Sequence, residues 1–101
     1  MSSALKVGRR SDLGPGAFRC VEAGGKRVVV YNVDGALYAT ADTCAHQGGP
    51  LGEGLLEGSV VTCPWHAWQF DVRTGVSVYD PRVRVATYPV KVIGDDILIE
   101  V

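Results

Sequence analysis

The stretch that decides the fold is Cys44-Ala45-His46 taken together with Cys63-Pro64-Trp65-His66. Sixteen residues separate the two segments, and each segment offers one thiolate and one imidazole. Together they hold both histidines and two of the three cysteines of the chain. Soft thiolates with borderline imidazoles suit iron–sulfur clusters and zinc, whereas magnesium and calcium sites are rich in carboxylates. The spacing therefore predicts one metal site to which two separate segments contribute.

This pattern resembles the signature of the Rieske family, in which C-x-H is followed, after a gap of about this length, by C-x-x-H. In that family two cysteines bind one iron, two histidines bind the other, and inorganic sulfides bridge them. The resemblance implies one Rieske-type [2Fe-2S] cluster per chain. The inner iron would be bound by Cys44 and Cys63, and the outer iron by His46 and His66.

Two other interpretations of the four residues stay open. Two cysteines and two histidines can form the tetrahedral shell of a structural zinc site, although such sites usually open with C-x-x-C and C-x-H is uncommon. Each residue taken singly also has an ordinary structural explanation, because a lone cysteine is usually a small core residue and a lone histidine a satisfied polar group. The remaining cysteine, Cys20, is expected to be a buried spacer or an inert thiol, since the ligand set is complete without it.

Four positions depart from the Rieske proteins of the respiratory cytochrome complexes, which this chain otherwise resembles. Those proteins carry an extra cysteine in each loop, joined as a disulfide, and Gly49 and Trp65 stand there in this chain. They also carry a serine and a tyrosine whose hydroxyls bond to sulfur, where this chain has Trp68 and Phe70. Hydrogen bonds to sulfur stabilise the reduced state, so their loss predicts a potential near the bottom of the Rieske range, about −150 mV.

The rest of the sequence predicts an all-β protein, because glycines and prolines interrupt it too often for long helices. Turn signals at Asp34-Gly35, at 73–75 and at 94–96 predict three hairpins. Their strand pairs are 27–32 with 36–40, 68–72 with 76–79, and 88–93 with 97–101. Residues 41–58 are expected to be loop with at most a short helical turn. The expected architecture is a Rieske fold, with an antiparallel sandwich or barrel base and a cluster-binding subdomain at about 40–70.

Bulk properties narrow the class of protein further. A chain of 101 residues has room for one domain, 1–101, and its 47% hydrophobic and 21% charged residues are ordinary for a water-soluble globular protein. The net charge of −1 argues against a nucleic-acid partner. No apolar run approaches the length of a membrane span, and residues 1–8 lack the apolar stretch of a secretory signal. Three cysteines suit a reducing compartment, so a cytoplasmic protein is expected.

The predicted function is electron transfer without catalysis. A Rieske oxygenase also needs a mononuclear iron site with two histidines, and both histidines of this chain are already used by the cluster. A glycine fingerprint for nucleotide binding is missing as well. The chain resembles the ferredoxins that carry electrons from a flavin-dependent reductase to a terminal oxygenase of the aromatic-ring class. Two alternatives are the small subunit of an assimilatory nitrite reductase and a zinc-stabilised interaction module.

Overall fold

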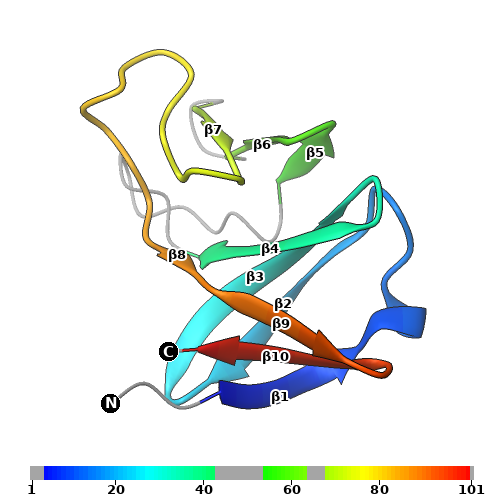
Figure 1. The fold of residues 1–101 in the computed structure, drawn as a ribbon. Coiled ribbons are helices and arrows are strands. Elements are labelled where there is room, and N and C mark those ends of the chain that lie inside the picture. Colours follow the sequence, from blue (N-terminus) through cyan, green and yellow to red (C-terminus); the bar gives the residue numbers. More distant parts are fainter. Residues whose placement is uncertain (1–3, 43–53, 64–67, 101) are drawn as a thin grey trace.

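Three antiparallel sheets form the described part of the chain, which covers residues 4–42, 54–63 and 68–100 of the computed structural model (Figure 1). The terminal sheet has the order β1 (Ala4–Arg9), β10 (Asp96–Glu100), β9 (Val90–Ile93). The central sheet has the order β2 (Phe18–Ala23), β3 (Lys26–Val33), β4 (Ala36–Ala41), β8 (Thr87–Tyr88). The upper sheet has the order β5 (Leu55–Glu57), β6 (Val60–Thr62), β7 (Gln69–Asp71). A short 3-10 turn, η1 (Arg10–Asp12), follows β1.

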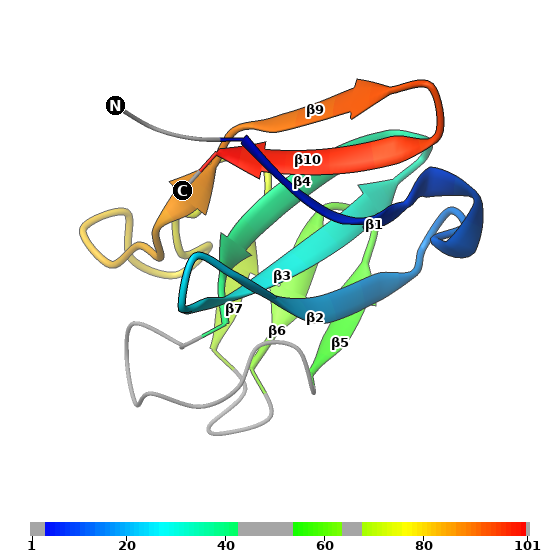
Figure 2. The same cartoon turned by 90° about the horizontal axis from the view of Figure 1, so that it is seen from below.

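The central sheet lies between the terminal and upper sheets (Figures 1 and 2). It separates two hydrophobic cores. The lower core lies between the terminal and central sheets and consists of Leu13, Ala23, Val28, Val30, Ala39, Ile97 and Ile99. The upper core lies between the central and upper sheets and consists of Val29, Tyr31, Val61, Cys63, Phe70, Val72 and Val85. Strand β3 supplies both cores from alternate residues, and this explains its continuous apolar run, because a strand buried on two faces needs apolar side chains at every position.

The β3–β4 hairpin confirms the prediction made from its turn. Asp34 and Gly35 have φ values of 51° and 94°, the positive pair that a tight type I′ turn requires. Asn32 fixes the turn from below, because its Oδ1 accepts a hydrogen bond of 2.7 Å from the Gly35 N–H. The chain is therefore in register from the first pair, Val33 with Ala36, onward.

The C-terminal hairpin is confirmed as well, with Gly94 at a φ of 62° and Ile97 paired with Val92. The strand predicted over 88–93 is nevertheless divided between two sheets. Residues before Pro89 pair with β4, and those after it pair with β10. The chain thus crosses from the central to the terminal sheet at Pro89, whose missing N–H cannot continue a ladder.

Two sequence predictions in the upper half were wrong in part. Strand β5 lies inside the segment 41–58 expected to be loop, and it pairs with β6 across a turn at Gly58. The strand expected over 76–79 makes one bridge to β7, Phe70 with Ser77, while β6 is the full partner of β7. The cause is Ser77, whose Oγ accepts hydrogen bonds from the next N–H groups, at Tyr79 and Asp80, and turns the chain away. Within the described ranges no helix is long and apolar enough to cross a membrane.

Candidate metal centre

One of the four predicted ligands, Cys63, lies in the described part of the chain. Cys63 follows β6 directly and is 1% exposed, with its side chain in the upper core. The other three predicted ligands, Cys44, His46 and His66, fall outside the described residues. The structure therefore shows the position of one predicted ligand, and of the residues at the base of each ligand-bearing segment, where that segment leaves the sheets.

The second segment leaves from the end of a hydrogen-bonded hairpin. The last pair between β6 and β7 is Thr62 with Gln69, and one residue further the Cys63 N–H donates a hydrogen bond of 2.7 Å to the Trp68 carbonyl oxygen. The two ends of residues 64–67 are held together by this bond. Because Cys63 stands at one of these ends, the hairpin fixes its backbone.

A chain of side-chain hydrogen bonds ties the neighbouring turn to this hairpin. The Tyr79 hydroxyl donates to Gln69 Oε1 at 2.9 Å, and Gln69 Nε2 donates to Thr62 Oγ1 at 3.2 Å. The ring of Tyr79 also meets the ring of Trp68 edge to face, with centroids 6.2 Å apart. The turn over 77–82 and the base of the second segment are thus one connected unit.

The first segment leaves from the end of β4. Asp42 follows β4, is 5% exposed, and is held to β3 by two contacts with Arg27. Its N–H donates to the Arg27 carbonyl oxygen at 3.1 Å, and its Oδ2 accepts from Arg27 Nε at 3.1 Å. Two residues later in the sequence comes Cys44. A buried carboxylate fixed on the central sheet therefore precedes the first predicted ligand.

Both bases border the upper core. Val29 of β3 lies in this core together with Cys63, and Val29 also pairs with Thr40 of β4, near the start of the first segment. The Thr40 hydroxyl shares a hydrogen bond of 2.8 Å with the Tyr31 hydroxyl, also in the core. Cys63 therefore offers a thiol that is shielded from water, in a core that also contacts the strand from which the first segment leaves. Thiolates together with imidazoles are the ligands of a Rieske cluster. The chemistry of the donor set and the burial of Cys63 therefore fit a Rieske cluster.

The side chains at positions 68 and 70 lack the hydroxyl groups that the Rieske proteins of the respiratory complexes have there. Phe70 is fully buried in the upper core and has no hydroxyl to donate. Trp68 is half-buried, and its ring contacts Tyr79. The side chain of Phe70 thus adds apolar contact, and no hydrogen bond, to the surroundings of the site.

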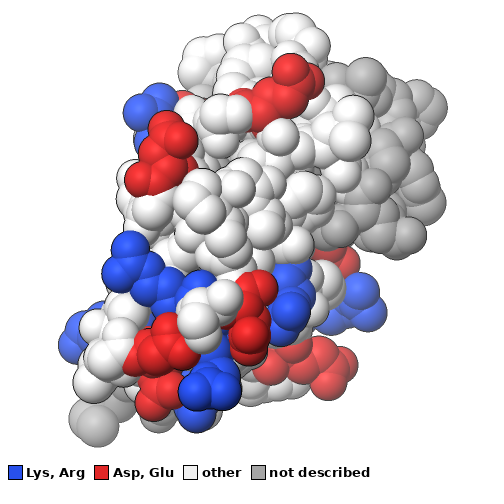
Figure 3. All heavy atoms as spheres, turned by 90° about the vertical axis from the view of Figure 1, so that its right-hand side faces the viewer, with Lys and Arg blue, Asp and Glu red and all other residues white. Residues whose placement is uncertain are grey.

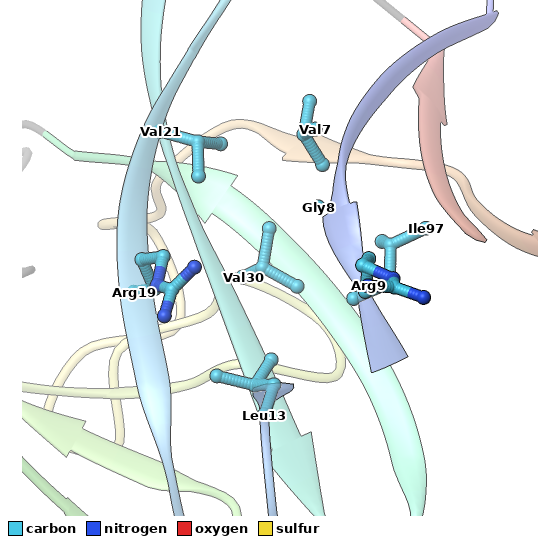
Figure 4. A pocket seen from close by; sticks show the side chains of 8 residues that line it. All are labelled: Val7, Gly8, Arg9, Leu13, Arg19, Val21, Val30 and Ile97. Atoms are coloured by element: carbon cyan, nitrogen blue, oxygen red, sulfur yellow. The ribbon is translucent and has the colours of Figure 1, made fainter. Parts of the chain in front are cut away.

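A separate small hollow lies in the lower half, where the edges of β1 and β2 face each other (Figure 4). Its walls are Val7, Gly8, Arg9, Leu13, Arg19, Val21, Val30 and Ile97. Its volume of about 10 Å³ admits about one water molecule. The hollow lies at the boundary between the terminal and central sheets, and none of the predicted ligands is among its lining residues.

Charged side chains are distributed unevenly over one face of the molecule. On the face shown in Figure 3, lysines, arginines, aspartates and glutamates intermingle over the lower half, while the upper half is largely uncharged. Leu55 of β5, in the upper sheet, is 67% exposed. On this face the half that carries Cys63 therefore offers a surface with few charged side chains.

Comparison with known proteins agrees with this geometry. The profile of the Rieske [2Fe-2S] domain matches residues 3–89. The chain belongs to the Rieske family. The cofactor of this Rieske domain is accordingly a [2Fe-2S] cluster, as the sequence predicted, and the zinc alternative is set aside.

The relatives of this Rieske protein are electron carriers. The ferredoxin component of biphenyl 2,3-dioxygenase from Rhodococcus jostii (strain RHA1) is 42% identical over 96 residues, 94% of this chain and 90% of that protein. The ferredoxin of carbazole 1,9a-dioxygenase from Nocardioides aromaticivorans IC177 has a TM-score of 0.89 and 30% identity, and the match covers 96% of both chains. A chain in a complex of reduced oxygenase and oxidized ferredoxin of carbazole 1,9a-dioxygenase has a TM-score of 0.89 and 37% identity, covering 96% of this chain and 92% of that one.

Sequence reasoning missed the residues that support the two ligand-bearing segments. These are Arg27 and Asp42 for the first segment, and Gln69 and Tyr79 for the second. A signal for the first pair was present, because counting back from the Asp34-Gly35 turn places Arg27 opposite Asp42. No comparable signal existed for Tyr79, whose contact depends on the turn at Ser77.

Proposed function

We propose that this Rieske protein is a cytoplasmic ferredoxin that carries one electron from a flavin-dependent reductase to a terminal oxygenase. Its cluster would be bound by Cys44, His46, Cys63 and His66. The observation that carries the proposal is the match to ferredoxin components of dioxygenase systems over nearly the whole length of both chains. These relatives favour an oxygenase partner over the nitrite reductase alternative.

The residues of this chain have supporting roles at the site. When bound, a Rieske cluster accepts and releases a single electron. Cys63 would hold the inner iron from a position closed to water, and the bond between its N–H and the Trp68 carbonyl oxygen fixes the backbone that carries the thiolate. The Arg27–Asp42 contact fixes the start of the segment that holds Cys44 and His46. Rigid support of this kind keeps the geometry the same in both redox states, which favours rapid electron exchange.

The same proposal includes a low reduction potential. Support comes from Phe70, because a phenylalanine in the place of a tyrosine removes one hydroxyl that would stabilise added electron density on sulfur. We expect a midpoint near the lower limit of Rieske centres, about −150 mV. A midpoint above about +100 mV would contradict this part of the proposal and leave the electron-carrier role intact.

The ligand set is tested by single substitutions with a matched control. We expect the purified protein to contain two iron and two sulfide per chain and to show the visible absorption of a Rieske centre. Cys44→Ser, His46→Ala, Cys63→Ser and His66→Ala should each abolish that spectrum after anaerobic reconstitution. Cys20→Ser is the control, and it should keep the full iron content. A ligand variant with full iron content would overturn the assignment of that residue.

The carrier role is tested by reconstituting turnover. A flavin-dependent ferredoxin reductase, this protein and a terminal aromatic-ring oxygenase are combined with reduced nicotinamide cofactor, and product is measured. Product formation should require the protein and saturate with its concentration. Equal product formation with and without the protein would contradict the proposal.

A further inference from the structure

A three-strand polar contact stands at the origin of the first ligand-bearing segment. The Arg27 guanidinium donates from Nε to Asp42 Oδ2 at 3.1 Å and from Nη2 to Cys20 Sγ at 3.4 Å. These residues belong to β3, to the end of β4 and to β2. The two charged partners differ in exposure. The Asp42 side chain is buried, at 7% exposed, whereas the Arg27 side chain is 64% exposed.

The contact lies close to a predicted ligand. Asp42 precedes Cys44 by two residues, so the two Cα atoms are at most about 7 Å apart even in a fully extended chain. The Asp42 backbone is also fixed, because its N–H bonds to the Arg27 carbonyl oxygen at 3.1 Å. Side chain and backbone therefore hold residue 42 in a single position relative to β3.

A buried carboxylate in this place has an electrostatic consequence. A negative charge opposes the arrival of an electron nearby, and low exposure weakens the screening by water. The guanidinium of Arg27, 3.1 Å from the carboxylate, opposes that effect. The balance of these two charges thus bears on the reduction potential, whereas a purely mechanical anchor would bear only on cluster retention.

We propose that Arg27 is a positioning residue for the first ligand-bearing segment and raises the reduction potential by balancing the Asp42 carboxylate. This inference rests on the proposed function, because it takes Cys44 as a ligand. Cys20 is a neutral member of the contact. Burial, followed by the charge of Asp42, raises the pKa of its thiol, so the sulfur accepts the Arg27 hydrogen bond without adding a charge at neutral pH.

The test is the midpoint potential of holo-protein variants, measured by spectroelectrochemical titration. Arg27→Gln leaves the carboxylate without this cation, so the equilibrium constant for reduction should fall about three- to tenfold. Tenfold corresponds to about 59 mV for one electron. Asp42→Asn removes the opposite charge and should raise the constant by a similar factor. The double variant should return to within about twofold of wild type, since both charges are gone.

Three further variants complete the test. Arg27→Lys keeps the positive charge but replaces the guanidinium fork by a single ammonium group, and its potential should stay within about twofold of wild type in the equilibrium constant for reduction. This variant also tests the proposal if Arg27→Gln fails to fold. Lys6→Gln removes an equal charge from an exposed ion pair with Asp96 in the terminal sheet, and should leave the potential unchanged. Cys20→Ala should also leave it unchanged.

Two results would overturn the inference. Potential shifts of the same sign in Arg27→Gln and Asp42→Asn would contradict the charge balance, because removing opposite charges must shift the potential in opposite directions. Shifts no larger than that of Lys6→Gln would show that the pair does not act on the site. Failure of the proposed function is distinguishable, because wild-type protein would then hold no Rieske cluster and give no titration.

Discussion

The lower and upper cores are of similar size and share strand β3, yet they differ in chemistry. The seven buried residues of the lower core are all aliphatic. The upper core includes the aromatic rings of Tyr31 and Phe70 and the thiol of Cys63. Buried polar groups accompany it, because Thr40 bonds to Tyr31 and Ser77 bridges to Phe70. The difference teaches that both cores stabilise the fold, while the upper core also holds the Cys63 thiol in place.

The largest effects should come from truncating one side chain in each core. Phe70→Ala and Ile99→Ala each remove a fully buried side chain, and each should cost about 3–4 kcal/mol of unfolding free energy. Only Phe70→Ala should also lower the iron content per folded chain, because Phe70 packs in the same core as Cys63. Urea unfolding and iron analysis of the folded fraction check both. Equal iron loss in the two variants would contradict the claim that only the upper core supports the cluster site.

A smaller effect is expected from substituting two glycines that both have a positive φ but differ in the room available for a Cβ atom. A Cβ at Gly75 would lie 2.3 Å from the Val85 carbonyl oxygen, whereas a Cβ at Gly94 meets nothing within 4 Å. Gly75→Ala should cost about 3 kcal/mol from strain and overlap, and Gly94→Ala about 1 kcal/mol from strain alone. Thermal unfolding measures both. Similar costs at the two positions would contradict the close approach of residue 75 to the chain at 85.

Within the upper half, two tyrosine hydroxyls should differ in their contribution. Tyr31→Phe removes the buried partner of the Thr40 hydroxyl and should cost about 1–2 kcal/mol. Tyr79→Phe removes an exposed hydrogen bond to Gln69 and should cost less than about 0.5 kcal/mol. Chemical denaturation of the two variants against wild type gives the values. A larger cost for Tyr79 would mean that the chain of bonds to Thr62 carries more of the stability.

The smallest effect is a pH dependence in the lower half. Hydrogen bonds from the Ser11 hydroxyl and N–H, at 2.6 and 2.9 Å, lower the pKa of Asp95 in the folded state. A depressed carboxyl pKa stabilises the fold above the unfolded value of 3.8 and loses that effect as pH falls through the folded pKa. Asp95→Asn should therefore be less stable than wild type at pH 7, and the difference should shrink below pH 3.8. A difference that stays constant with pH would exclude this carboxylate as the source.

Much of the fold could be predicted because local signals agreed with tertiary structure. Asp34-Gly35 and Gly94 supplied turns that only certain residues adopt, and the adjoining strands alternate or run apolar as their burial requires. Strand β5 could not be predicted, because its three residues lie among glycines and form a strand through pairing with β6. The division of the 88–93 strand at Pro89 could not be predicted either. It depends on which sheet lies beside each half, and tertiary packing decides this.

The candidate site followed the same rule. The [2Fe-2S] cofactor could be predicted because few residue types bind iron–sulfur clusters, and two short motifs contain both histidines of the chain. The supporting contacts could not, because Gln69 and Tyr79 are ordinary polar residues whose partners are set by the turn at Ser77. The Arg27–Asp42 contact could be predicted in part. The register of the hairpin places the two residues opposite each other, but only the structure shows that the Asp42 carboxylate is buried.

The most direct test of the central claim is to count histidine nitrogens on the reduced cluster. The chain has two histidines, so ¹⁵N-histidine labelling marks only His46 and His66. Pulsed EPR of the reduced protein should show two strongly coupled ¹⁵N nuclei, one from each ligand-bearing segment. Coupling to one or to neither would contradict a cluster held jointly by the two segments.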